Sequence, residues 1–339
     1  MKAVAATAPG RVEVVEIPRP TIREYECLVR VRACGFCSST DLKIIHGELS
    51  DMTVDFPAVI GHEAVGEVVE VGEAVRNVRA GDAFTNPAGR VEPGTPYSRM
   101  WAGMAEYAVV QDHEVMDELG VDPSGYTARA ARRVPGDMPA EDAAVLLTLK
   151  EGYSALENFG FEPGMDVLVW GDGVAGRGLV TFLRMRGAGW VGCIGHHDDR
   201  LGEVRRVGGA DATINSNGRD PAEALEERRF DLVIDAVGST HIILSASQML
   251  KPGGKVGVYG VLKKGHAEIS LLDLKNNSCV HMLNFPHREH DAHEAVLAMV
   301  EEGRLDPKDF YSHALPIDDV QKAVELIESR RALKVVLTM

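Results

Sequence analysis

Hydrophobic and polar residues in the first third of the chain follow the pattern of short β-strands. Apolar or alternating runs of strand length occupy residues 12–18, 26–32 and 67–72, and proline and glycine residues interrupt the chain between them. Short strands separated by frequent turns are typical of a β-rich, barrel-like domain.

From about Glu141 the pattern changes to apolar strands that alternate with amphipathic helices. Strands are predicted at residues 166–170, 190–194, 231–237 and 255–259, with helices at residues 174–186, 201–207 and 241–250. This β-α-β-α order predicts an open parallel sheet with helices on both faces. Two more helices, starting near Asp291 and Asp318, precede a final predicted strand at residues 333–337.

Composition narrows the class of protein. The 339 residues suggest two domains at about 100–200 residues each, and the net charge of −15 argues against a nucleic-acid or anionic membrane surface. No stretch approaches the roughly 18 apolar residues that a membrane span needs, and Arg11 comes too early for a secretory signal. Five cysteines are too few and too scattered for a disulfide framework. We expect a cytoplasmic protein.

The segment Gly171–Gly176 has the pattern G-x-G-x-x-G between a predicted strand and a predicted helix. In that context the glycines allow a tight turn and a close approach of a dinucleotide pyrophosphate to the start of the helix. The residues expected to contact the cofactor are Gly171, Gly173, Val174, Ala175 and Gly176.

The end of the second predicted strand favours NADP over NAD. NAD-binding chains place an acidic residue there to hold the ribose hydroxyls, whereas this chain has Gly195. The donors that could bind a 2′-phosphate instead are His196, His197 and Arg200. The alternative is that Asp198 or Asp199 holds the ribose. On the first interpretation, Gly195→Asp is expected to shift the preference towards NAD.

A second group of residues could bind a metal. Cys34 and Cys37 form a C-x-x-C pair, but no second such pair completes a four-cysteine site. A catalytic zinc needs only about three protein ligands and one open position. Cys37, His62 and a carboxylate meet that requirement.

Together these motifs resemble the zinc-type medium-chain dehydrogenases/reductases, over essentially the whole chain. The matching segments are C-G-F-C…T-D (34–41), G-H-E-A-V-G-E-V (61–68), V-R-A-G-D (78–82), G-M-A-E-Y (103–107) and the glycine fingerprint. The resemblance implies an α/β protein with a GroES-like catalytic domain at residues 1–145, completed by residues 286–339, and a Rossmann domain at residues 146–285. It also implies a zinc in the interdomain cleft that polarises an alcohol oxygen while hydride passes to the nicotinamide.

The resemblance assigns Cys37 and His62 as zinc ligands and Glu63 as the carboxylate that ligates the zinc or lies beside it. The third ligand of the family aligns with Leu147 or Thr148, neither of which is a good donor, and Glu151 is interpreted as a solvated helix residue rather than a substitute. Residues 86–99 lack the four cysteines of the structural zinc lobe. One catalytic zinc and no structural zinc are therefore expected.

The same resemblance assigns the proton chemistry. Thr40 matches the hydroxyl that bonds the substrate oxygen, although the longer spacing leaves Ser39 as an alternative, and Lys43 stands where many members have the relay histidine. His287, His290 and His293 are interpreted as a polar surface or cleft loop rather than a metal cluster. Cys193 and Cys279 are predicted to be core residues.

The function that these observations favour is hydride transfer between NADP(H) and a secondary alcohol or ketone. A polyol, sugar or aminocyclitol is expected because two predicted substrate loops carry the polar residues Tyr97, Ser98, Arg99, Asn284, His287 and Arg288. The alternatives are a zinc-free quinone or enone reductase and a non-catalytic nucleotide-binding protein. A homo-oligomer, dimer or tetramer, is expected, with no nucleic-acid or membrane partner.

Overall fold

A computed structural model describes residues 1–49, 52–122, 130–218, 220–225, 228–283 and 288–339. The chain divides into two compact units. The first unit comprises Met1–Leu147 and His293–Met339, and the second comprises Thr148–Ala292. No helix in the described ranges is both long enough and apolar enough to cross a membrane.

The first unit is built on two β-sheets. A seven-stranded sheet has the order β16-β17-β3-β5-β6-β9, with β8 paired to β3, and a four-stranded sheet has the order β2-β1-β4-β7. The strands are β1 (Lys2–Ala8), β2 (Arg11–Glu16), β3 (Glu26–Phe36), β4 (Ala58–Val59), β5 (Glu63–Val71), β6 (Ala83–Thr85), β7 (Ser98–Arg99), β8 (Tyr107–Gln111), β9 (Arg132–Val134), β16 (His313–Pro316) and β17 (Val335–Thr338). Nearly every residue of β3 is buried, because this strand has neighbours along both edges.

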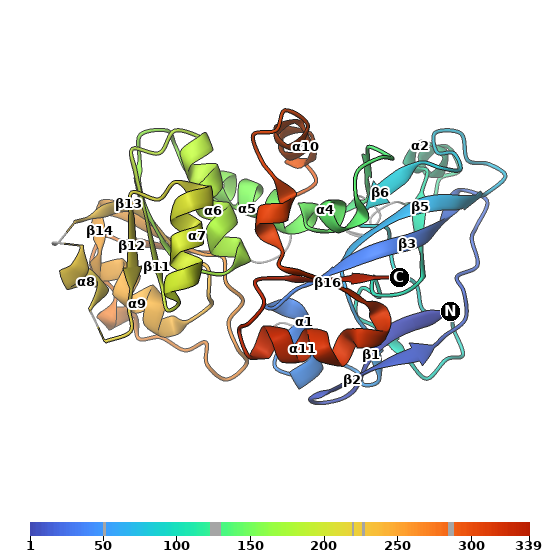
Figure 1. Cartoon of the computed structure of the whole chain (residues 1–339), viewed down its shortest axis with the longest axis horizontal. Helices are drawn as coiled ribbons and strands as arrows, with labels where there is room; N and C mark the ends of the chain where they lie inside the picture. Colours follow the sequence, from blue (N-terminus) through green and yellow to red (C-terminus); the bar gives the residue numbers. More distant parts are fainter. Residues whose placement is uncertain (50–51, 123–129, 219, 226–227, 284–287) are drawn as a thin grey trace. The chain divides into compact units, whose positions relative to one another are not determined.

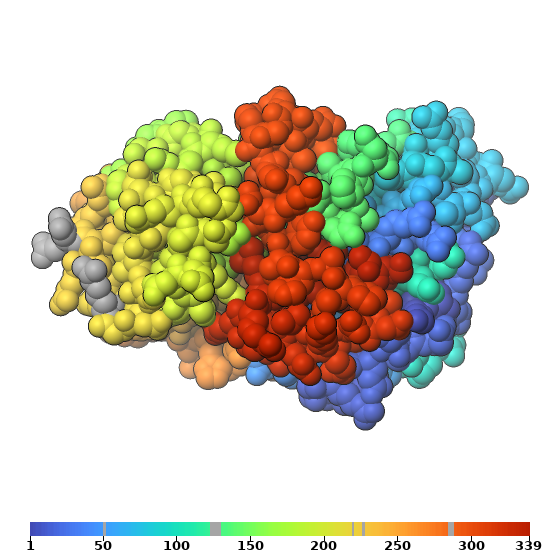
Figure 2. Space-filling model, viewed as in Figure 1, coloured from blue at the N-terminus to red at the C-terminus, as the bar shows by residue number. Residues whose placement is uncertain are grey.

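Short helices cover these sheets. They are α1 (Thr40–His46), α2 (His113–Glu118), α4 (Ala140–Ala144), α10 (His293–Glu301), α11 (Val320–Glu328) and the 3₁₀ turns η2 (Pro307–Phe310) and η3 (Ile317–Asp319). In α11 the apolar residues recur at helical spacing and are buried. Figure 2 shows this C-terminal segment, in red, against the blue N-terminal strands. An ion pair also joins the two segments, with Lys2 Nζ 2.7 Å from Asp318 Oδ2.

The second unit is a six-stranded sheet in which all neighbouring strands are parallel, in the order β12-β11-β10-β13-β14-β15. Its strands are β10 (Asp166–Trp170), β11 (Trp190–Gly195), β12 (Ala212–Asn215), β13 (Phe230–Asp235), β14 (Leu250–Val258) and β15 (Cys279–Met282). Its helical segments are α5 (Leu146–Asn158, which starts just before the unit boundary), α6 (Val174–Met185), α7 (Asp198–Gly208), α8 (Pro221–Ala224), α9 (Thr240–Gln248) and η1 (Leu271–Asp273).

Successive strands are added on one side of β10 first and on its other side afterwards. The chain passes from β10 outward to β11 and β12, and then returns to place β13 on the other side of β10. Because such crossovers are right-handed, α6 and α7 cover one face and α9 covers the other. Figure 1 shows α6 and α7 side by side, and Leu168, Ile194 and Ile243 belong to one core cluster on the α9 face. This topology confirms the predicted doubly wound sheet and opens its ligand crevice beyond the carboxyl end of β10.

Two sequence interpretations of single residues are wrong. Cys193 is buried as predicted, but Cys279 is exposed because β15 is the edge strand of its sheet. His293 is buried rather than on a polar surface, and its Nε2 lies 2.8 Å from the Arg133 carbonyl oxygen. His287 lies outside the described residues.

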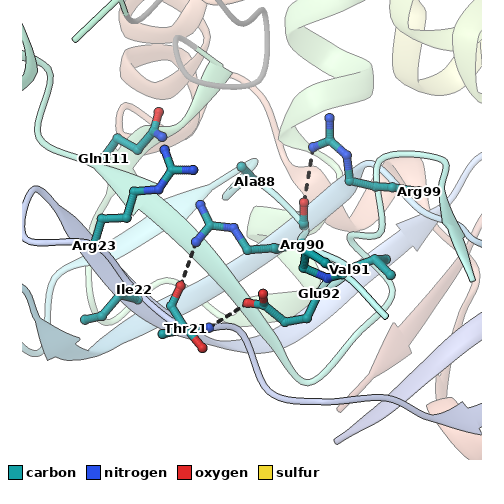
Figure 3. A pocket seen from close by; sticks show the side chains of 11 residues that line it. Thr21, Ile22, Arg23, Ala88, Arg90, Val91, Glu92, Arg99 and Gln111 are labelled. Carbon is teal, nitrogen blue, oxygen red and sulfur yellow. Dashed lines mark hydrogen bonds between the residues drawn. The ribbon is translucent and has the colours of Figure 1, made fainter. Parts of the chain in front are cut away.

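A buried ion pair fixes the segment that aligns with the structural zinc lobe. The Arg90 guanidinium donates to both oxygens of Glu26, at 2.6 and 2.9 Å, and to the Thr21 carbonyl oxygen at 2.7 Å. The Glu26 side chain has no exposure, and Gln111 Nε2 also donates to it at 3.1 Å. Arg90 and Gln111 line a pocket of about 520 Å³ (Figure 3). This segment is therefore tied to the start of β3 by a buried ion pair.

Removing the cation from this pair should destabilise the first unit. Burial opposes the charge on Glu26, but hydrogen bonds from Arg90, Arg23 and Gln111 outweigh it and lower the pKa of Glu26. Arg90→Met should lower the free energy of unfolding by about 3 kcal/mol, because it leaves a buried carboxylate without its counter-ion. Urea unfolding followed by circular dichroism measures this.

The control is Arg19→Met, whose ion pair with Glu70 is about half exposed on both sides and should matter little. Because the pKa of Glu26 is lowered on folding, the stabilisation is present above about pH 4 and is lost as the pH falls through the lowered value. Equal effects of the two variants at pH 7 would contradict a structural role for the Arg90 pair.

Candidate functional site

Three potential metal ligands converge where β3 and β5 pair. One ligand atom from each of Cys37, His62 and Glu63 lies within 4.8 Å of the other two. Cys37 directly follows β3, Glu63 opens β5, and the antiparallel register places Gly35 opposite Glu63. The structure thus brings together the three residues that the sequence proposed as ligands.

The buried carboxylate of Asp41 lies next to the His62 ring. His62 Nδ1 lies 3.3 Å from Asp41 Oδ1, and His62 Nε2 lies 3.9 Å from Glu63 Oε1. Neither His62 Nδ1 nor Asp41 Oδ1 has a well-formed hydrogen bond within the described part of the chain. Carboxylates in this position commonly orient metal-binding imidazoles through the second ring nitrogen. A thiolate, an imidazole and a carboxylate are also donors that zinc accepts, so these residues fit a metal ion.

The neighbouring His62 favours the ionised form of the Cys37 thiol. Burial opposes ionisation of Cys37, but the hydrogen bond and charge of His62 outweigh it and lower the pKa of Cys37. Burial likewise opposes protonation of His62, yet the charge of Asp41 and the contact with Cys37 raise the pKa of His62. A thiolate is the form of cysteine that binds metals.

A buried lysine, which the sequence analysis missed, completes the cluster. Lys334 Nζ lies 2.6 and 2.8 Å from the two oxygens of Glu63, and both side chains are almost fully buried. Burial opposes the charge of Lys334, but Glu63 and Cys37 raise its pKa. A single charge between Leu333 and Val335 in an apolar strand was the available signal.

The residues assigned to proton transfer lie at the start of α1. Thr40 is buried, and its backbone N–H donates to Cys37 Sγ at 3.4 Å. Lys43 Nζ donates to Ser39 Oγ at 3.3 Å. Asp41 Oδ2 accepts from the Cys37 N–H at 2.8 Å, which anchors the turn between β3 and α1.

The positions that align with the third ligand carry no Cys, His, Asp or Glu side chain. Leu147 and Thr148 are both buried. Glu151 is only partly exposed, and its Oε2 accepts a hydrogen bond from the Tyr259 hydroxyl at 3.3 Å. Glu151 is thus a partly exposed helix residue with one protein partner, and its role stays a prediction.

In the second unit, the glycine fingerprint forms the turn between β10 and α6. Gly171 has φ +135°, and a Cβ on Gly176 would lie 1.8 Å from the Gly171 carbonyl oxygen, so both positions require glycine. Gly173 is the N-cap of α6, which starts with Val174 and Ala175. Backbone N–H groups at such a helix start can bind phosphate.

A cavity of about 740 Å³ lies along α9 and reaches the carboxyl ends of the strands. Trp170, His196, Ser216 and Val237 are among its lining residues, and they follow or end four neighbouring strands. Arg200 and His197 are partly exposed near the start of α7, and Asp198 Oδ1 accepts from Asn215 Nδ2 at 2.7 Å.

The fingerprint contributes an acidic residue that the sequence analysis did not assign. Asp172 Oδ2 accepts from the backbone N–H groups of His196 and His197, both at 2.8 Å. A Cβ on Gly195 would lie 2.5 Å from this carboxylate oxygen. The expectation that Gly195→Asp alone shifts the cofactor preference is therefore corrected, because the new side chain has no space.

The polar residues expected to line a substrate loop have other contacts. Tyr97 packs against an apolar cluster of the first unit, and Ser98 Oγ donates to the Asp55 carbonyl oxygen. Arg99 donates to the Gly89 carbonyl oxygen at 3.3 Å. Arg288 Nε donates to Asp291 Oδ2 at 2.9 Å, and Asn284 and His287 lie outside the described residues. These contacts give no added support for a polyhydroxylated substrate.

Both parts of the chain are similar to known protein families. The profile "Alcohol dehydrogenase GroES-like domain" matches residues 23–119, and "Zinc-binding dehydrogenase" matches residues 175–302. An alcohol dehydrogenase of Geobacillus stearothermophilus is 30% identical over 274 residues, 74% of each chain. A sorbitol dehydrogenase of Bacillus subtilis (strain 168) is 23% identical over 96% of this chain and 93% of its own. The solved alcohol dehydrogenase of Thermus sp. ATN1 superposes with a TM-score of 0.81, at 26% identity and 100% coverage of both chains.

The Glu63–Lys334 pair yields a stability prediction. Lys334→Met should lower the free energy of unfolding by about 3–5 kcal/mol, since it leaves a buried carboxylate without a cation. Glu63→Gln with Lys334→Met should recover part of the loss, because no buried charge remains. Urea unfolding of metal-free protein measures both. A double variant as unstable as Lys334→Met would show that the lysine acts through packing rather than charge.

Proposed function

Because the chain belongs to the zinc-type medium-chain dehydrogenases/reductases and is an NAD(P)-dependent alcohol dehydrogenase of that family, we propose a more specific activity. It transfers hydride between NADP(H) and a secondary alcohol or ketone, with a polyol, sugar or aminocyclitol as the substrate class. In this proposal the protein binds one catalytic zinc and no structural zinc. The observation that carries the proposal is the buried convergence of Cys37, His62 and Glu63.

Cys37 and His62 are the two metal ligands, and Glu63 is the third or lies beside the ion. A bound zinc supplies Lewis-acid polarisation of the alcohol oxygen, and the nicotinamide accepts or donates the hydride. Asp41 orients His62 from behind, at 3.3 Å from Nδ1. Lys334 holds Glu63 through both of its oxygens, which limits the reach of that carboxylate toward a metal.

The proton of the alcohol leaves through the start of α1. The Thr40 hydroxyl, whose backbone N–H already contacts Cys37 Sγ, accepts it from the substrate oxygen and gives up its own proton in the same step. Lys43 lies one helical turn later, with Nζ 3.3 Å from Ser39 Oγ. In this proposal Lys43 occupies the relay position: as the neutral amine it accepts the proton that Thr40 gives up and then releases it to solvent, while Ser39 positions the lysine side chain rather than replacing Thr40.

The second unit is the nucleotide-binding domain, and the catalytic domain consists of residues before and after it. The cofactor pyrophosphate binds at the Gly171–Gly176 turn, against the first N–H groups of α6. The adenosine part enters the 740 Å³ cavity beside His196. NADP is preferred because residue 195 has no carboxylate, while Arg200 and the His196 ring supply donors for a 2′-phosphate.

A zinc-free quinone or enone reductase is the second candidate. The buried, apolar Leu147 and the engagement of Glu63 by Lys334 favour it, since both reduce the number of available ligands. The retained Cys37–His62 pair with Asp41 behind it argues for the metal enzyme. Dialysis against a chelator distinguishes the two, because only the metal enzyme loses turnover and regains it with zinc. The chain is further proposed to act as a homo-oligomer, which light scattering measures.

The metal prediction concerns stoichiometry. Elemental analysis should find about one zinc per chain at most, and His62→Ala should lose most of it, because too few donors remain to hold the ion against water. His46→Ala is the control, since His46 pairs with Glu328 on the surface. Two zincs per chain, or full retention in His62→Ala, would contradict the proposed site.

The cofactor prediction concerns Arg200. Arg200→Ala should reduce kcat/KM with NADP by about tenfold or more and change NAD little, since a charge-assisted hydrogen bond contributes roughly 1.5–3 kcal/mol. Arg205→Ala, an exposed change later in α7, is the control. An equal loss with both cofactors, together with a higher wild-type kcat/KM for NAD, would overturn the proposed preference.

A further inference from the structure

A carboxylate is present at the end of β11 although no acidic residue of that strand provides it. Asp172 is the second residue of the glycine fingerprint and is only 7% exposed. Its Oδ2 accepts three hydrogen bonds: from His196 N at 2.8 Å, from His197 N at 2.8 Å and from the His197 ring Nδ1 at 2.9 Å. Burial opposes the charge of this group, but the donors from His197 and His196 lower the pKa of Asp172. It is therefore ionised at neutral pH.

The parallel register of β10 and β11 explains the contact. Trp170 pairs with Ile194, so Asp172, two residues beyond β10, and Gly195, the last residue of β11, meet at the carboxyl end of the two strands. A Cβ on Gly195 would lie 2.5 Å from both Cβ and Oδ2 of Asp172 and 2.6 Å from Cγ. Side chains on residues 172 and 195 therefore compete for one volume.

Further hydrogen bonds hold the 196–197 turn in place, with the His196 ring lining the cavity. The His196 Nδ1 lies 3.1 Å from Ser216 Oγ, and its carbonyl oxygen accepts from Asn217 Nδ2 at 2.7 Å. His196 and Ser216 both line the 740 Å³ cavity. The backbone N–H groups of residues 196 and 197 are already used by Asp172, so side chains must recognise the ribose substituent.

We propose that Asp172 is the positioning residue that sets cofactor discrimination. Its side chain, from Cβ outward, excludes any side chain from position 195, and its carboxylate holds the 196–197 turn with the His196 ring toward the ribose. This inference rests on the proposed nucleotide site and adds a mutual exclusion: a side chain can stand at 172 or at 195, but not at both.

The test uses nucleotide fragments, so that binding is measured without turnover. Calorimetry with 2′,5′-ADP and 5′-AMP compares wild type with Gly195→Ala, Gly195→Asp, Asp172→Ala, Asp172→Asn and the Asp172→Gly/Gly195→Asp double variant, in which glycine at 172 also removes the Cβ that position 195 would meet. Asp211→Ala is the matched control, because Asp211 accepts from Val191 N at the opposite end of β11. A thermal melt of each variant reports folding.

Gly195→Ala and Gly195→Asp should each weaken both fragments by about tenfold or more, and the double variant should recover 5′-AMP binding and prefer it over 2′,5′-ADP. Asp172→Ala should reduce the ratio of the two affinities toward one. Asp172→Asn should retain part of that ratio, because its amide oxygen still accepts backbone N–H groups. Asp211→Ala should leave the ratio unchanged.

Normal 5′-AMP binding by Gly195→Asp alone, or an unchanged ratio in Asp172→Ala, would overturn the proposal. If the Gly195 variants do not fold, Asp172→Ala and Asp172→Asn decide it. A wild type that prefers 5′-AMP would refute the NADP preference alone, since the exclusion is still tested by the recovery of 5′-AMP binding in the double variant.

Discussion

The candidate metal site depends on the pairing of β3 with the strands on its two sides. Its antiparallel register with β5 sets Gly35 opposite Glu63, and its register with β17 sets Phe36 opposite Val335. The glycine is required, because a Cβ there would lie 2.3 Å from Glu63 Oε2. These two registers bring Cys37, Glu63 and Lys334 to one end of three adjacent strands, so a slip of one residue in either pairing would take the cluster apart.

Periodicity and local motifs predicted the elements that depend on neighbours in the sequence. The helix expected at residues 174–186 is α6, and its glycine turn follows β10 as expected. The proposed ligands Cys37, His62 and Glu63, each of which lies in a short motif with a recognised chemistry, do lie close together. The doubly wound order followed from the alternation of strands and helices.

Contacts between distant segments were not predictable in the same way. Lys334 is 271 residues from Glu63, and its place in an apolar strand marks it as unusual without indicating its partner. Asp172 was assigned no role because its partners follow a different strand, and Cys279 was misjudged because the sequence does not reveal which strand lies at the edge. In each case the missing information was the order of strands in a sheet, which depends on tertiary packing rather than local preference.

The distance along the chain between Glu63 and Lys334 also affects how the protein is made. Translation delivers residues 1–147 first, then all of the second unit, and only afterwards the segment that carries β17. The second unit is continuous in sequence and can fold as it emerges from the ribosome. The first unit cannot close its seven-stranded sheet, or neutralise the Glu63 carboxylate with Lys334, until the second unit has been synthesised. The nascent chain can therefore complete its second unit before it can assemble the candidate metal site.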